Sequence, residues 1–113
     1  LPLTAGGKAL LAASADGEEV LRRVAARRDL AHHLDLDRAL DELATTRERG
    51  YALAAGVRGL IGIAAAVVDR DGEPVAALSV SAPADRLPSS KQPEVVEAVL
   101  GTAAHLAESI GRL

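Results

Sequence analysis

The sequence predicts an α/β fold of the α+β type, in which an antiparallel sheet is flanked by helices. Two apolar segments, residues 60–68 and 73–82, are separated by the turn sequence DRDG and indicate a β-hairpin. Helical periodicity before and after this hairpin predicts the flanking helices. A sheet of two or three strands has exposed edges, so we expect the sheet to be incomplete in this chain of 113 residues.

The composition restricts both the core and the classes of function. Hydrophobic residues make up 49% of the chain, yet Tyr51 is its only aromatic residue and it contains no Cys or Met. The core must therefore be built from aliphatic side chains, without a disulfide framework. A net charge of −3 argues against nucleic-acid binding by this segment itself. No apolar run approaches the length of a membrane span, so we expect a cytoplasmic domain without membrane contact.

The N-terminal third predicts a loop and two helices. Pro2 and the pair Gly6-Gly7 indicate a loop, and residues 8–13 favour a short helix. The segment EEVLRRVAARR, residues 18–28, predicts a second helix, because its acidic first turn and basic last turn complement the helix dipole. Its interleaved charges indicate a solvated helix face rather than a nucleic-acid patch. The polar connection DLAHHLDL follows.

The third predicted helix has clear start and stop signals. Asp35 is a suitable N-cap and Gly50 stands at a typical C′ position. Residues 51–55 then predict a short strand. A final helix with one apolar face is expected from about Pro93 to about Arg112.

The predicted hairpin determines which side chains share a face of the sheet. An even-numbered loop pairs Gly62 either with Ser79 or, if Asp71-Gly72 forms the turn, with Ser81. A three-residue loop would break the assignment that follows. The opposite face carries larger side chains and is the natural side for helices: Ile61, Ile63, Val67, Leu78 and Val80. Both pairings with an even-numbered loop place the same six residues on one face. We call it the small-residue face: Gly62, Ala64, Ala66, Ala77, Ser79 and Ser81.

The two serines of the small-residue face suggest a binding role. Ser79 and Ser81 stand two residues apart, so their hydroxyls point to the same side of a strand. Small neighbours leave space, and hydroxyls both donate and accept hydrogen bonds, which suits a small polar ligand. Alternatively, a helix packs closely on this face and the serines bond to its backbone. The strand by itself leaves both interpretations open.

Most of the chain resembles a known family. The segments LPLTAGGKALLA, DLDRALDELATTRERGY and IAAAVVDRDGEPVAALSVSAP occur in the family's order, with GKALLA, RERGY and ALSVSAP the most specific parts. They resemble the C-terminal effector-binding domain of IclR-type transcriptional regulators. The resemblance implies a GAF-like or profilin-like domain, of which residues 1–113 form the C-terminal portion. It further implies a winged helix-turn-helix domain upstream, outside this chain, that contacts DNA, and a homodimer or tetramer.

The resemblance also implies a pocket for a small carboxylate or an aromatic acid, without a cofactor or metal. Ser79 and Ser81 match the family's paired pocket serines, and Gly62 matches a position that is often Cys. Ala5 and Gly6 fall in the loop before the first helix, where backbone N–H groups meet an effector carboxylate. A helix N-terminus beside glycine is physically suited to an anion.

Two departures from the family pattern affect the expected ligand. Ala54 or Ala55 occupies the place where a pocket Asp is often found, and Ala66 stands where the family often has Pro. The missing carboxylate and the small Gly62 predict a roomier, less polar pocket. Two outcomes follow from these departures: a bulkier or more apolar effector than a two- or three-carbon keto acid, or loss of ligand binding altogether.

Other chemistries have less support in the sequence. AGGKA lacks the spacing of a phosphate loop, and the adjacent pair His32-His33 lacks metal-ligand spacing. No G-x-S-x-G motif or strand-end histidine accompanies Ser79, so we expect no enzymatic activity. The alternative function is a GAF-like sensor or dimerisation module that does not bind DNA.

Overall fold

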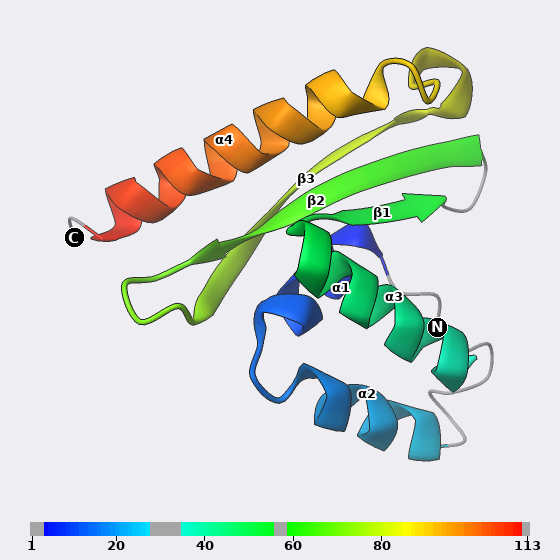
Figure 1. Ribbon diagram of the computed structural model, residues 1–113, viewed down its shortest axis with the longest axis vertical. Helices are drawn as coiled ribbons and strands as arrows, with labels where there is room; N and C mark the ends of the chain where they lie inside the picture. The colour runs from blue at the N-terminus through cyan, green and yellow to red at the C-terminus, as the bar shows by residue number, and fades with distance from the viewer. Residues whose placement is uncertain (1–3, 28–34, 56–58, 112–113) are drawn as a thin grey trace.

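The computed structural model describes residues 4–27, 35–55 and 59–111 as three layers, with a sheet between helices (Figure 1). Helix α4 covers one face of the sheet, and α1, α2 and α3 lie on the other side, with α2 farthest from the strands. The α+β class expected from the sequence is confirmed. In chain order the elements are α1 (Ala5–Ala13), α2 (Gly17–Ala26), α3 (Leu36–Arg49), β1 (Ala52–Ala55), β2 (Leu60–Val68), β3 (Pro74–Pro83), the 3-10 turn η2 (Ala84–Arg86) and α4 (Gln92–Gly111).

The sheet is antiparallel, with strand order β1-β2-β3. Gly62 pairs with Ser81 and Ala64 pairs with Ser79, which is the second of the two registers considered from the sequence. Strand β1 and strand β3 form the two edges of the described sheet. The outer edge of β3, ten residues long, has no partner strand among the described residues.

The hairpin reaches its register by an unexpected route. The Asp69 N–H donates to the Glu73 carbonyl at 2.9 Å, so the loop between them has three residues rather than an even number. A register shift follows at Val67/Val68, because Val68 pairs with Pro74 whereas Val67 pairs with Ala76. At this point β3 has one more residue than β2, and this extra residue compensates for the odd number of residues in the loop. The small-residue face is therefore retained although the expected turn is wrong.

The larger side chains of the sheet form the main core with α4. Ile63, Val67 and Val99 are buried almost completely, with Ile63 at 0% exposure. Partly buried residues of β2, β3 and α4 pack against this cluster: Ile61, Leu78, Ala82, Val95, Val96, Ala107 and Ile110. At the hairpin tip, the Arg70 guanidinium donates to the Gly111 carbonyl at the end of α4. The strongly apolar face predicted from the hairpin is thus the one that α4 covers.

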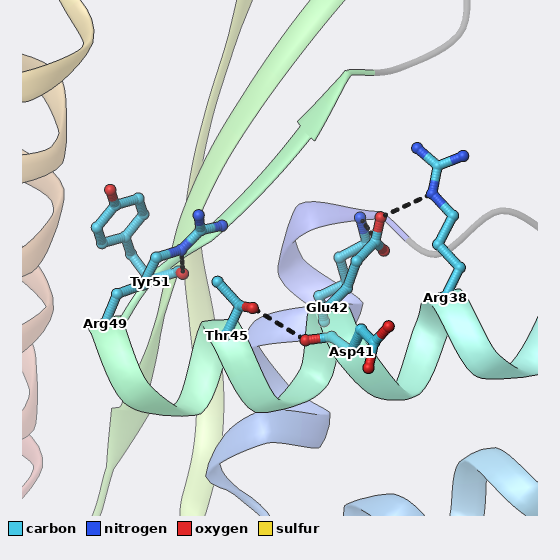
Figure 2. Close-up of polar contacts among 7 residues, drawn as sticks. Arg38, Asp41, Glu42, Thr45, Arg49 and Tyr51 are labelled. Carbon is cyan, nitrogen blue, oxygen red and sulfur yellow. Dashed lines mark hydrogen bonds and ion pairs between the residues drawn. The ribbon is translucent and has the colours of Figure 1, made fainter.

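Helix α1 packs on the small-residue face through alanines, in a cluster of Ala5, Ala9, Ala52 and Ala64. Polar contacts hold α1 to α3. The Lys8 ammonium lies 2.8 Å from the Glu42 carboxylate, and Arg47 Nε donates to the Ala12 carbonyl at 2.9 Å. Figure 2 shows Glu42 and its second partner Arg38 along α3, with Arg49 at the end of that helix. These contacts fix the helix that meets the small-residue face.

Most predicted helix ends are confirmed, but α2 ends at Ala26, two residues before its predicted end, and α1 begins earlier than expected. Asp35 caps α3 by accepting from the Arg38 N–H at 3.2 Å, and Gly50 ends that helix with φ of 86°. Helix α1, however, begins at Ala5 rather than Lys8, so Ala5 and Gly6 are helical and not part of a loop. There are two reasons: Thr4 acts as a local N-cap, and tertiary packing on the sheet overrides the low helix propensity of glycine. His32 and His33 lie outside the described residues.

Candidate functional site

The predicted site residues meet where the first turn of α1 lies on the sheet. A Cβ built at Gly62 would lie 3.3 Å from Ala5 Cβ and 3.7 Å from Ser81 Oγ. One at Gly6 would lie 3.8 Å from Ala77 Cβ. The structure therefore brings Ala5, Gly62 and Ser81 together, with Gly6 beside them over β3. Glycine at position 62 is what permits this close approach between helix and strand.

Two rows of small residues cross all three strands at this point. Ala54 pairs with Gly62, which pairs with Ser81, and Ala52 pairs with Ala64, which pairs with Ser79. Ala55 pairs with Ile61 and so belongs to the opposite face. Of the two alanines in place of the family's Asp, Ala54 is thus the one in the site. No carboxylate is contributed by this part of β1.

The start of α1 leaves two backbone N–H groups without a partner in the helix. The Gly7 N–H donates to Thr4 Oγ1 at 3.0 Å, and the Lys8 N–H donates to the Thr4 carbonyl at 2.9 Å. These bonds leave the N–H groups of Ala5 and Gly6 as the first-turn donors without an intrahelical acceptor. Such donors, with the positive end of the helix dipole behind them, favour an anion.

The serines lie at the edge of the site and are accessible. Ser79 and Ser81 are both exposed. Within the described part of the chain neither serine hydroxyl takes part in a hydrogen bond, including one to the α1 backbone. Helix packing on this face is therefore real, as the alternative interpretation expected, but the serines do not serve it. Their hydroxyls stay available to a ligand.

Substitution of Thr4, the N-cap of α1, tests whether its hydroxyl stabilises the first turn of the helix. We expect Thr4→Ala to lower the free energy of unfolding by about 1 kcal/mol, because the Gly7 N–H loses its acceptor. Thr4→Ser keeps the hydroxyl and is expected to stay within a few tenths of a kcal/mol of the parent chain. Urea unfolding followed by circular dichroism measures both variants. Equal losses in the two variants would refute the capping role.

A concave region that the sequence did not predict lies on the other face of the sheet. A hollow of about 410 Å³, which we call the α4 hollow, opens between β1 and the first turns of α4. It is lined by Tyr51, Leu53, Ser89, Gln92, Pro93, Val96, Glu97 and Leu100. These residues come from separate segments and show no motif, so only the folded chain brings them together.

The described residues hold neither a candidate metal site nor a candidate membrane span. They contain no group of three or more His, Cys, Asp or Glu side chains placed to hold a metal ion. None of the helices in the described ranges is both long and apolar enough to cross a membrane.

Comparisons with known proteins address the family and the fold of the chain. The family model described as Bacterial transcriptional regulator IclR C-terminal matches residues 1–108. No curated protein matches the chain. Among solved structures, the repressor BlcR of Agobacterium tumefaciens is 29% identical with a TM-score of 0.80, over 98% of this chain and 48% of that one. The C-terminal domain of KdgR from E. coli is 30% identical with a TM-score of 0.79, over 96% and 69%.

The IclR of Thermotoga maritima is similar as well, at 25% identity and a TM-score of 0.82, over 96% of this chain and 46% of that one. The chain thus spans about half the length of two of these relatives. The family and these neighbours are transcriptional regulators rather than enzymes, in agreement with the expectation from the sequence. Because the family model covers nearly all of the chain, this protein belongs to the IclR family of bacterial transcriptional regulators, in the part that forms their C-terminal domain.

Proposed function

We propose that this chain is the effector-binding part of an IclR-family regulator and binds a small organic acid on the small-residue face. The observation that carries the proposal is the meeting of Ser81 and Gly62 with the first turn of α1. The N–H groups of Ala5 and Gly6 would receive the carboxylate. The hydroxyls of Ser79 and Ser81 would bind its polar oxygens from the strand side.

Ala54 favours an effector that is less polar than a two- or three-carbon keto acid, because it contributes a methyl group and no carboxylate. Ala54 adds a partly buried methyl group to the row that contains Gly62, whereas Ala52 and Ala64 of the neighbouring row are buried beneath α1. A carboxylate with an aromatic or branched body suits a face that has both polar and apolar groups. The helix end would bind the charge, and the body would contact the Ala54 side of the face.

In the whole regulator, the effector would act by shifting populations. A ligand that binds one arrangement of subunits more tightly than another favours that arrangement. A change in subunit arrangement alters the spacing of paired DNA-binding domains on an operator. We accordingly propose a cytoplasmic homodimer or tetramer that contacts DNA only through a separate winged helix-turn-helix domain. Operator binding by the full-length protein distinguishes this from a sensor that does not bind DNA.

A thermal-shift series tests the ligand site. The series compares benzoate, phenylacetate, pyruvate and acetate. A ligand at a hundredfold excess over its Kd is expected to raise the free energy of unfolding by about 2.7 kcal/mol. Loss of one hydrogen bond to a charged ligand costs about 1.5 kcal/mol, so Ser81→Ala is expected to weaken the best ligand roughly tenfold. Ser79→Ala should also weaken it.

Ser109→Ala provides the matched control, because Ser109 is exposed on α4, on the other side of the sheet. Its affinity for the acid should equal that of the parent chain. If the affinity survives both strand substitutions unchanged, the assignment of the site to Ser79 and Ser81 is wrong. If none of the four acids binds, the carboxylate proposal itself fails.

A further inference from the structure

The α4 hollow has the size and wall composition of a small-molecule site. Its volume of about 410 Å³ falls within the range of ligand pockets, about 300–1,000 Å³. Along α4, the lining residues Pro93, Val96, Glu97 and Leu100 follow helical spacing and so form one continuous wall. Leu53 and Tyr51 of the neighbouring β1 segment form the other. Most of this lining is apolar.

The polar groups in the hollow include two oxygen acceptors. The Gln92 Nε2 group donates to the Leu87 carbonyl at 3.3 Å, and its Oε1 accepts no hydrogen bond within the described residues. Glu97 contributes the single charged side chain of the lining. Within the described ranges the Glu97 carboxylate makes no hydrogen bond or ion pair. The hollow therefore presents an unneutralised negative charge beside apolar walls.

The aromatic wall is held in a fixed position. The Arg49 guanidinium carbon lies 4.5 Å from the centroid of the Tyr51 ring, and Arg49 Nε donates to the Tyr51 carbonyl at 2.8 Å. Figure 2 shows the ring standing between the end of α3 and helix α4. The guanidinium therefore occupies the Tyr51 ring, and the ring serves the hollow as an apolar wall rather than as a partner for a second cation. Arg49 is not among the residues that line the hollow.

We propose that the α4 hollow is a second ligand site, for an amphiphilic organic cation: a primary ammonium group on an aromatic or aliphatic body. The Glu97 carboxylate and the Gln92 carbonyl oxygen bind the ammonium, and the Leu53, Val96 and Leu100 side chains contact the body. Charge complementarity selects this occupant, because the lining supplies one carboxylate and no basic group. The site lies on the face opposite the proposed acid site, prefers the opposite charge, and does not depend on that proposal.

Methyl NMR spectroscopy of the chain with benzylamine as the probe tests this inference. Binding is expected to shift the methyl resonances of Leu53, Val96 and Leu100 at millimolar probe. Benzyl alcohol and benzoate have the same ring without the ammonium, and they are expected to bind at least severalfold more weakly. The methyl groups of Ala5, Ala9 and Ala64, on the far face of the sheet, should not move.

Two substitutions separate charge recognition from simple hydrophobic contact. Glu97 is exposed, so we expect Glu97→Gln to weaken benzylamine about threefold, the contribution of an exposed ion pair. Glu94→Gln removes the same charge from an exposed position on the same helix that does not line the hollow, and it should leave the affinity unchanged. Val96→Trp fills the hollow and should abolish binding.

Three results would overturn the proposal. The first is equal binding of benzylamine and benzyl alcohol, which means that the charge is not recognised. The second is an equal effect of the Glu94 and Glu97 substitutions, which indicates long-range electrostatics rather than contact. The third is a concentration-dependent shift of the Leu53 and Leu100 methyl groups without any probe, which assigns the hollow to a second copy of the chain.

Discussion

Replacing Gly17 with alanine is expected to destabilise the chain by about 3 kcal/mol or more, because an added Cβ there makes the closest contact of any described glycine. Gly17 is buried at the start of α2. A Cβ there would lie 2.0 Å from the Leu11 carbonyl oxygen and 2.9 Å from its carbonyl carbon. Because both atoms belong to the backbone of α1, no side-chain rotation relieves the overlap. Helix α2 must move away, which exposes Leu21.

The matched control is Gly101→Ala in the middle of α4, where a Cβ meets nothing within 4 Å. That substitution removes a flexible residue from an exposed helix position and is expected to stabilise the chain by about 0.5–1 kcal/mol. Urea unfolding followed by circular dichroism gives both free energies. A lower free energy of unfolding for Gly17→Ala, with a higher one for Gly101→Ala, supports the packing of α2 on α1. A small loss at Gly17 would show that the two helices are not in contact there.

Truncation of Ile63 to alanine is expected to be similarly costly, at about 3–4 kcal/mol. Ile63 lies at the centre of β2 with 0% exposure and contacts the core beneath α4. The core has no Phe, Trp or Met that could move to fill the space. The cavity therefore persists, and the cost includes both lost burial and the void.

Leu60→Ala on the same strand serves as the comparison, since Leu60 is 41% exposed. We expect it to lower the free energy of unfolding by less than about 1 kcal/mol. Unfolding of the two variants in guanidinium chloride measures the difference between their free energies of unfolding. The comparison requires that this free energy falls with denaturant concentration at the same slope in both variants. Similar losses for Ile63 and Leu60 would contradict the burial of β2 beneath α4.

The elements with strong local signals were predictable from the sequence. Helix α3 has an N-cap at Asp35, a helical apolar pattern and a C-terminal glycine, and its observed bounds follow these signals. The apolar strands and the two faces of the hairpin were predictable as well, because side-chain alternation has a period of two. The grouping of Gly62 with Ser81 follows from that alternation.

Features that depend on contacts between distant segments were not predictable. The first turn of α1 contains Gly6 and Gly7, which locally favour a loop, yet packing on Gly62 keeps it helical. The hairpin loop has an odd length, and only pairing of whole strands shows the compensating irregularity at Val67/Val68. Likewise, nothing in DGEEV signals that the glycine lies against the Leu11 carbonyl.

The position of Tyr51 gives the chain a built-in optical reporter. With no Trp or Phe in the sequence, ultraviolet emission of the chain arises from this one phenol. Tyr51 lines the α4 hollow, while the proposed acid site lies across the sheet. A ligand in the hollow alters the emission directly, whereas an acid on the small-residue face leaves the phenol's surroundings unchanged. The intrinsic fluorescence of the unlabelled chain thus distinguishes which side of the sheet a compound has reached.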